Sequence, residues 1–319
     1  MLHGDVMKKI KLGLTGIEIT KLALGTWVFG GAEWGGADDS DSIDTLNRAL
    51  DSGINFFDTA LAYGDGHAEQ LIGKILKPVR EKVVIASKAK GNYADVTQLF
   101  EKSLGFLGME YIDLYYIHWP PEDNHIEKMI EKIAKLQTAG KIRAIGLSNF
   151  TLEQIRRAMS VARIDALQMP YNLFWRYIEN DIKTFCQENS ISIISYSPLS
   201  RGLLSGKFTS DWKYVKDDNR ETNVIFRNHF KEALNGVEKV KCLAEKKKTT
   251  TAALAIKWIM QKNWISSILI GARTPRQLQE NLNACQLSIS DSDYITLDEI
   301  SNEVFSQIRD AGYSNPFSG

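Results

Sequence analysis

Short apolar runs recur along the chain, and the segments between them have the hydrophobic periodicity of helices. Eight runs are apolar at almost every position, which is typical of strands buried on both faces of a parallel sheet. The runs span residues 22–26, 54–58, 83–88, 112–118, 142–148, 166–168, 192–197 and 267–271. The pattern therefore predicts eight buried strands rather than the alternating strands of a half-exposed sheet.

Amphipathic helices are expected between these runs. Ile43, Leu46 and Leu50 would lie on one face of the first helix. Thr151 and Gln154 have the spacing of a capping box, which predicts a helix that begins directly after Thr151. Similar periodicity predicts helices over residues 66–76, 95–107, 125–139, 178–189, 231–247, 251–262, 275–285 and 291–301.

The alternation of eight strands with helices predicts an α/β fold. We expect one (β/α)8 TIM barrel domain over residues 1–319, with 1–7 as a leader. A doubly wound open sheet competes with it, but no GxGxxG fingerprint follows a strand. Residues 9–24 predict an N-terminal β-hairpin that turns at 15–16. Residues 200–230 break the rhythm, and a long rim loop over the barrel mouth is expected there.

Charge and composition narrow the class of protein. Lys and Arg number 39, as do Asp and Glu, so the net charge is zero and nothing favours a nucleic acid partner. No apolar stretch of about 18 residues predicts a membrane span. Cys186, Cys242 and Cys285 are far apart, which predicts reduced thiols in a cytoplasmic protein. No metal-ligand spacing is present, so no metal site is expected. The sequence leaves the oligomeric state undecided.

Four successive apolar runs end on a polar residue at a constant interval. Asp58, Lys88, His118 and Ser148 are each 30 residues apart, which is the length of one βα unit. In a barrel these positions fall on the C-terminal rim, where active sites of this fold lie. The interval therefore predicts that the four side chains gather at one site.

The residue types can form a proton-transfer group. Free tyrosine has a pKa of about 10, and a nearby ammonium favours its phenolate. Lys88 would supply that charge to Tyr63, and Asp58 would keep the buried lysine charged. His118 would orient a carbonyl. We therefore expect Tyr63 to be a general acid.

A resemblance to a known family rests on motifs that follow one another in order. They are "GTW" at 25–27, "FFDTALAYG" at 56–64, "IASK" at 85–88, "YYIHWP" at 115–120, "IGLSNF" at 145–150, "LQMPYN" at 167–172, "SYSPLSRGLLSGK" at 195–207 and "LIGARTPRQLQEN" at 269–281. Over nearly the whole chain the sequence resembles the aldo-keto reductases, in particular a bacterial branch that also resembles potassium-channel β subunits. The resemblance implies a barrel that binds NADP(H) and reduces carbonyls, with Asp58, Tyr63, Lys88 and His118 as its catalytic tetrad.

The resemblance also implies the residues that bind NADP(H), with NAD(H) less favoured. Ser148, Asn149 and Gln168 would hydrogen-bond the nicotinamide carboxamide, and Tyr196 would stack on the nicotinamide ring. The other cofactor residues implied by position are Thr26, Trp27, Asp58, Ser197, Pro198, Leu199, Arg201, Lys207, Gly271, Ala272, Arg273, Gln277, Glu280 and Asn281.

One position departs from the family pattern near the adenosine phosphate. Many members carry an arginine after a "PKS" motif, whereas this chain has Gln277 there. Arg273 or Arg276, at the start of a helix that would stabilise an anion, would bind the 2′-phosphate instead. Arg220, in the irregular loop, is a weaker candidate.

The expected substrate is a small carbonyl compound, or an alcohol or sugar in the reverse direction. Trp27 and Trp119 directly follow rim residues, and with Tyr63 and His118 they are expected to wall the substrate pocket. Residues 174–175 are the second choice. The sequence does not name the substrate itself.

Three other interpretations stay open at this point. Asp58 and Lys88 could form a structural ion pair without catalysis. The protein could be an NADP-binding, redox-sensing regulatory subunit with little turnover. An aldolase or isomerase with a Schiff base on Lys88 would use the same barrel, but it leaves Asp58 and Tyr63 poorly explained.

Overall fold

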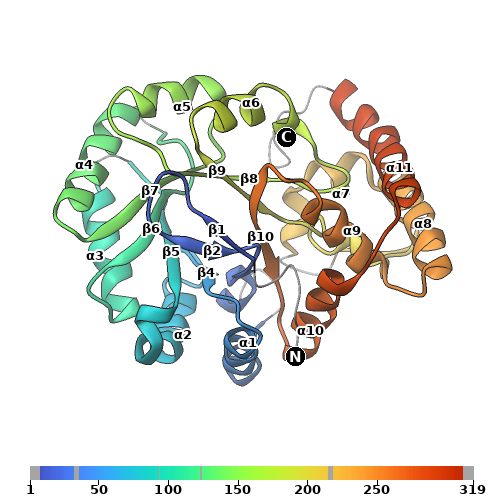
Figure 1. The fold of residues 1–319 in the computed structure, drawn as a ribbon, viewed down its shortest axis with the longest axis horizontal. Coiled ribbons are helices and arrows are strands. Elements are labelled where there is room, and N and C mark those ends of the chain that lie inside the picture. The colour runs from blue at the N-terminus through green and yellow to red at the C-terminus, as the bar shows by residue number, and fades with distance from the viewer. Residues whose placement is uncertain (1–7, 32–35, 93, 123, 215–217, 312–319) are drawn as a thin grey trace.

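Eight parallel strands close into a barrel in this computed structural model. The structure describes residues 8–31, 36–92, 94–122, 124–214 and 218–311. The strand order is β10-β3-β4-β5-β6-β7-β8-β9, and every neighbouring pair is parallel. Figure 1 shows the strands at the centre with helices around them. The predicted (β/α)8 barrel is confirmed, and the competing open sheet is wrong.

Each barrel strand overlaps one predicted apolar run. The strands are β3 Leu22–Gly25, β4 Phe56–Asp58, β5 Val84–Ala89, β6 Ile112–Ile117, β7 Ile142–Ser148, β8 Ala166–Pro170, β9 Ser192–Tyr196 and β10 Ile265–Gly271. All residues of β4, β5 and β6 are buried. Apolar side chains on both strand faces therefore fill the barrel on one side and the layer beneath the helices on the other.

Helices follow the strands and cover the outside of the barrel. They are α1 Asp39–Asp51, α2 His67–Leu76, α3 Val96–Leu107, α4 Ile126–Thr138, α5 Leu152–Met159, α6 Asp181–Glu188, α7 Val224–Asn228, α8 Phe230–Lys246, α9 Thr251–Met260, α10 Pro275–Asn283 and α11 Asp291–Asp310. The predicted capping box at α5 is confirmed, because Gln154 N donates to Thr151 Oγ1 at 3.3 Å and Thr151 N donates to Gln154 Oε1 at 2.9 Å. Each predicted helix has a counterpart among these.

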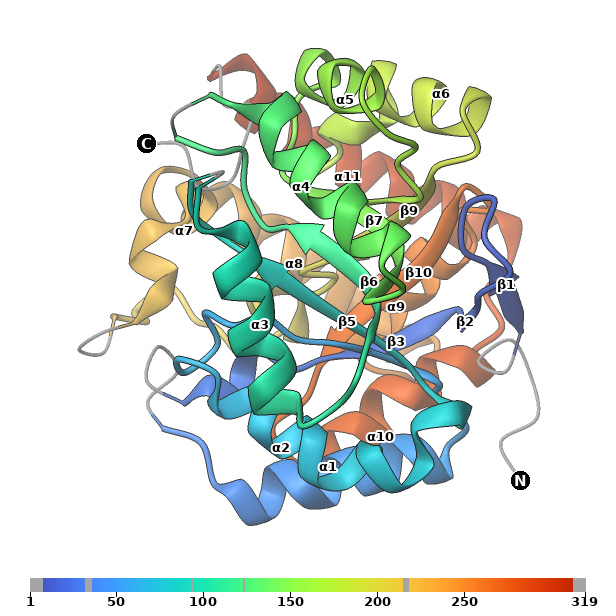
Figure 2. The same ribbon diagram turned by 90° about the vertical axis from the view of Figure 1, so that its left-hand side faces the viewer.

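The predicted N-terminal hairpin is present and lies at one end of the barrel. Strands β1 Lys9–Lys11 and β2 Glu18–Thr20 pair antiparallel. Gly13 N donates to Ser192 Oγ, at the start of β9, over 2.8 Å. In Figure 2 the hairpin and α7 lie at opposite ends of the barrel. The hairpin therefore covers the N-terminal ends of the strands and leaves the C-terminal ends for a site.

The predicted insertion after β9 is an irregular segment that ends in a short helix. It contains 3₁₀ helices at Leu203–Ser205 and Asn219–Thr222 before α7. Its aromatic rings pack on one another: Phe208 contacts Trp212 and Phe226 with centroid distances of 5.0 and 5.5 Å. This aromatic packing gives the segment a small core of its own.

Within the described residues, no helix is long and apolar enough to cross a membrane. All three cysteines carry free thiols; Cys186 and Cys285 are buried, and Cys242 is exposed. Burial raises the pKa of the Cys186 thiol to about 12, which keeps that thiol protonated and unreactive.

Candidate active site

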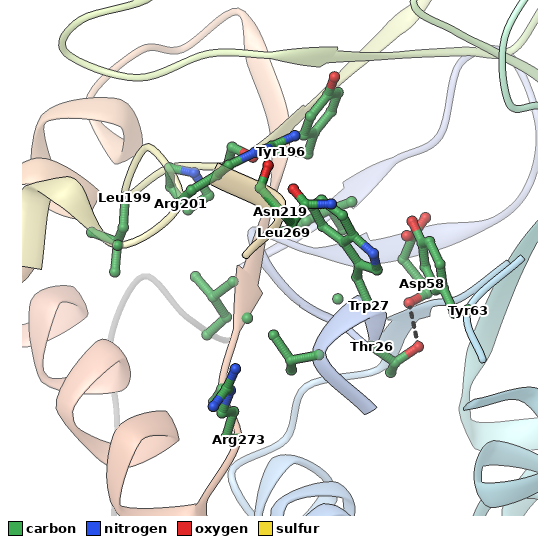
Figure 3. Close-up of a pocket in the computed structure, with 18 of the residues that line it drawn as sticks. Thr26, Trp27, Asp58, Tyr63, Tyr196, Leu199, Arg201, Asn219, Leu269 and Arg273 are labelled. Carbon is green, nitrogen blue, oxygen red and sulfur yellow. Dashed lines mark hydrogen bonds between the residues drawn. The ribbon is translucent and has the colours of Figure 1, made fainter. Parts of the chain in front are cut away.

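A cavity of about 920 Å³ opens at the C-terminal ends of the barrel strands. Its walls come from the strand ends and from the insertion after β9. Figure 3 shows Asp58 and Tyr63 on one side of it and Arg273 on the other. The residues predicted from the sequence that line it are Thr26, Trp27, Asp58, Tyr63, His118, Trp119, Ser148, Asn149, Gln168, Tyr196, Ser197, Pro198, Leu199, Arg201, Lys207, Arg220, Gly271, Ala272, Arg273, Gln277, Glu280 and Asn281.

Lys88 lies behind this lining, fully buried, and its ammonium group joins the catalytic candidates. Lys88 Nζ donates to Asp58 Oδ1 at 2.5 Å, to the Thr59 carbonyl at 2.7 Å and to the Tyr63 hydroxyl at 3.2 Å. An ammonium group has three protons to donate. The three contacts therefore satisfy the buried cation completely and place its charge against the Tyr63 oxygen.

The Asp58 and Lys88 pair compensates for the loss of water around both charges. Burial raises the pKa of Asp58, and the Lys88 charge opposes that rise. Burial lowers the pKa of Lys88, and the charge of Asp58 opposes that fall. Gln168 Nε2 donates to the second Asp58 oxygen, Oδ2, at 2.8 Å. Both carboxylate oxygens thus have donors, as a buried charge requires.

A tight turn after β4 presents Tyr63 to the cavity. Tyr63 N donates to the Ala60 carbonyl at 3.0 Å, and the following Gly64 has a φ of 62°. Gly30 packs directly on this turn: a Cβ there would lie 2.7 Å from Gly64 N and 2.9 Å from the Tyr63 carbonyl carbon. The Trp27 ring stacks on Tyr63 with centroids 6.3 Å apart. Two contacts therefore fix the phenol from the β3 side.

His118 faces Tyr63 across the cavity floor. Their rings meet edge to face, with centroids 5.8 Å apart. Burial, with added repulsion from Lys88 and Lys90, holds the pKa of His118 well below its usual value. His118 is therefore neutral at neutral pH, so that it can orient a carbonyl by hydrogen bonding but carries no proton to give up as an imidazolium.

The amide and hydroxyl groups expected to meet the nicotinamide are linked to one another. Tyr196 Oη donates to Asn149 Oδ1 at 2.7 Å, and Asn149 Nδ2 donates to Ser148 Oγ at 3.0 Å. Asn149 has a φ of 65° and Ser197 one of 54°, so both hold left-handed backbone at the cavity wall. Gln168 lines the same region, and its amide nitrogen donates to Asp58 Oδ2.

Cations gather at the other side of the cavity. Burial and the charge of Arg220 lower the pKa of Arg273. Burial lowers the pKa of Lys207, and the charges of Arg220 and Arg273 lower it further. Asp218 Oδ1 lies 2.9 Å from Arg220 Nη1 and offsets part of this charge. Mutual repulsion among three partly buried cations is relieved by a bound anion, so this side can hold phosphate groups.

Two sequence expectations are wrong at this site. Arg276 lies outside the cavity lining; its side chain is 89% exposed and pairs with Glu280 at 3.0 Å. It is therefore not placed to replace Arg273 in binding a 2′-phosphate. Phe174 and Trp175 are buried in the hydrophobic core, not in the wall of the cavity.

Other residues that line the cavity were not predicted from the sequence. Lys90, Asn219, Thr222 and Thr250 line the cavity but belong to no recognised motif. Asn219 and Thr222 come from the irregular insertion, where no periodicity indicates which side chains point inward. Lys90 could have been found, because it stands two residues after Lys88 and a strand places such residues on the same face.

Comparisons with known proteins agree with this geometry. The model of the Aldo/keto reductase family matches residues 21–302. Aldo-keto reductase YhdN of Bacillus subtilis is 39% identical over 86% of this chain and 87% of its own. The NADH-specific methylglyoxal reductase of Escherichia coli is 35% identical over 92% of this chain and 98% of its own.

The fold of this chain is also similar to that of a solved structure. The glycerol dehydrogenase of Gluconobacter oxydans superposes with a TM-score of 0.83 at 34% identity, covering 92% of this chain and 95% of that one. The family match spans most of the chain, and the barrel carries its polar residues where that fold places active sites. This chain therefore belongs to the aldo/keto reductase family, whose members are oxidoreductases that act on carbonyls and alcohols.

Proposed function

We propose that this chain is an NADP(H)-dependent carbonyl reductase in which Tyr63 is the general acid. The observation that carries the proposal is the buried Lys88 ammonium, which contacts both Asp58 and the Tyr63 hydroxyl at the cavity wall. A structural ion pair has no need of a half-buried phenol at a cavity wall as its third member. The phenol faces the space in which a substrate would lie, and the cation behind it favours release of the phenolic proton.

Each residue has one task in the proposed reaction. NADPH, when bound in this cavity, would supply the hydride that the carbonyl carbon accepts. Tyr63 donates its hydroxyl proton to the carbonyl oxygen, and Lys88 stabilises the phenolate left behind. His118, being neutral, orients the same oxygen by a hydrogen bond. In the reverse direction the Tyr63 phenolate accepts the proton of an alcohol or sugar.

The set of groups around the cavity suits a nicotinamide dinucleotide. Ser148, Asn149 and Gln168 offer polar groups to an amide, and the Tyr196 ring lines the same part of the cavity, where it can stack. At the other side Lys207, Arg220 and Arg273 offer positive charge to phosphates. We infer a preference for NADPH over NADH from Arg273, which lines the cavity and lies close enough to Arg220 for the two charges to interact.

The two rival functions are less well supported. A Schiff base needs a neutral Lys88 with an available lone pair, whereas Lys88 donates three hydrogen bonds, one of them to a carboxylate. A regulatory subunit that binds NADP would keep the same cavity. Such a subunit would differ from an enzyme in its low turnover. The complete group of Asp58, Tyr63 and Lys88 at the cavity favours an enzyme.

The test is the Tyr63→Phe variant. It removes one oxygen and leaves the ring that stacks on Trp27. Reduction of a neutral aromatic aldehyde, followed as loss of NADPH absorbance, should slow by about a thousandfold, as expected for a lost general acid. Quenching of tryptophan fluorescence by NADPH should be unchanged. A variant that keeps most of its activity would rule out Tyr63 as the acid.

A further inference from the structure

Lys90 is a second lysine at the same strand end as Lys88. Strand β5 runs through Lys88 to Ala89, and side chains two residues apart lie on the same face of a strand. Lys88 points into the barrel, so Lys90 points to the barrel mouth about 7 Å further along the chain. It is exposed there and lines the cavity.

Lys90 lies level with His118. Ala89 pairs with Ile117 in the register of β5 and β6, and His118 N donates to the Ala89 carbonyl at 2.8 Å. The next residues on the two strands, Lys90 and His118, therefore stand side by side. The charge of Lys90 is one of the causes that lower the pKa of His118. Lys90 thus acts on the part of the cavity that is expected to hold the substrate carbonyl.

No protein group compensates Lys90 in the described part of the chain. Lys90 has no ion pair or hydrogen bond there, and Asp58, a carboxylate that lines the same cavity, is occupied by Lys88 and Gln168. The Lys88 charge is compensated within the barrel by Asp58. An exposed cation at a cavity wall without a protein partner is available to a charged group on a ligand.

The position of Lys90 separates it from the cations expected to bind the cofactor. In the barrel order β10-β3-β4-β5-β6-β7-β8-β9, strand β5 is four places from β9, on the opposite wall. Lys207 follows β9 and Arg273 follows β10. Lys90 instead stands beside His118, whose neighbour in the chain, Trp119, also lines the cavity. Its charge is therefore placed for the substrate rather than for the cofactor phosphates.

We propose that Lys90 binds an anionic group of the substrate, and that the preferred substrates are carbonyl compounds with a carboxylate or phosphate a few bonds from the carbonyl. This inference rests on the proposed reductase function, because it assigns one part of the same cavity. It narrows the substrate from carbonyl compounds in general to anionic ones.

The test compares one acid with its own ester. 4-Formylbenzoate and methyl 4-formylbenzoate share the aldehyde and the ring but differ in charge. The acid-to-ester ratio of kcat/KM should fall about fivefold in Lys90→Gln, the size expected for one solvent-accessible ion pair. Lys90→Arg should keep the ratio within about twofold of the original. Effects on the shared chemistry cancel in the ratio.

A ratio that is the same in the original protein and in Lys90→Gln would overturn the role of Lys90 while leaving the reductase intact. A protein that reduces neither compound would instead count against the proposed function. In that case tryptophan quenching still decides on Lys90. Tighter binding of the acid than of the ester, lost in Lys90→Gln, supports the anion site, and equal binding overturns it.

Discussion

At the scale of single residues, the site is organised around Lys88, a cation that is buried away from solvent. Lys88 is 0% exposed, and a lone ammonium in that position would lose its proton. Asp58 prevents this by direct contact, and the Thr59 carbonyl and the Tyr63 hydroxyl accept the other two hydrogen bonds of the ammonium group. The same contacts that make Lys88 tolerable in the core therefore place its charge where a phenolate would form.

Removing Asp58 should therefore destabilise the fold as well as the activity. In Asp58→Asn the Lys88 charge loses its partner, and the free energy of unfolding should fall by about 3 kcal/mol, the cost of breaking a buried pair. Urea denaturation measures this loss. In the double variant Asp58→Asn with Lys88→Met the loss should be smaller than the sum of the two single losses. Strict additivity would show that the two residues do not depend on each other.

His118 should make the protein less stable in mild acid. Its pKa in the folded state is well below 6.5, whereas the unfolded chain takes up the proton near 6.5. The unfolded state therefore binds more protons below that pH, and the free energy of unfolding should fall by up to about 1.4 kcal/mol per pH unit from this group. Urea denaturation at several pH values between about 7.5 and 5 measures the slope.

The variant His118→Phe separates this effect from general acid sensitivity. It should show a shallower slope over the same pH range. Identical slopes in the original protein and in His118→Phe would remove His118 as the cause.

Cofactor choice should depend on Arg273. Arg273→Gln should weaken NADPH binding by about tenfold or more, as expected for a hydrogen bond between charged groups, and NADH binding far less. Fluorescence titration measures both affinities. Arg276→Gln is the matched control, because Arg276 is exposed, lies three residues further along the chain and is outside the cavity. Equal losses for the two cofactors would move the 2′-phosphate away from Arg273.

At the scale of elements, the hydrophobic pattern of the sequence predicts the strands of the barrel, but it predicts helix ends and the insertion after β9 less well. Every strand overlaps its apolar run, because burial on both faces favours apolar residues at most positions of a strand. Helix ends are less certain: α11 continues to Asp310, beyond the expected end at 301, because Val304 and Ile308 extend its buried face. The insertion after β9 has no period, so its cavity residues Asn219 and Thr222 could not be predicted.

The turn that carries Tyr63 is an element whose geometry can be tested. A Cβ at Gly30 would press on Gly64 and on the Tyr63 backbone at less than 3 Å, so Gly30→Ala should displace the phenol. We expect kcat to fall by about tenfold or more, since small misplacements of reacting groups are costly. Steady-state kinetics measures it.

Gly105→Ala is the control for this prediction. Gly105 lies within α3, and an added Cβ there would meet nothing within 4 Å. Its kcat should match that of the original protein. A Gly30→Ala protein with unchanged kcat would show that the turn can yield without moving Tyr63.

At the scale of the whole molecule, barrel closure brings together residues that the sequence keeps far apart. The 30-residue interval predicted that Asp58, Lys88 and His118 would meet, since they follow neighbouring strands. The hydrogen bond between Gln168 and Asp58 depends on closure of the barrel. Strand β8, which carries Gln168, is four places from β4, and the Gln168 side chain crosses the barrel to reach Asp58. A contact across the barrel depends on the shape of the closed sheet, so the sequence could not predict it.

Catalytic turnover is tested most directly by a progress curve with NADPH in large excess over the protein and 4-formylbenzoate as the carbonyl. We expect steady consumption of many equivalents of NADPH per protein, because Tyr63 is restored by a proton from water after each cycle and nothing in the site retains the product covalently. Consumption that stops after one equivalent, with NADPH bound, would rule out an enzyme of this kind and would favour a regulatory NADP-binding subunit.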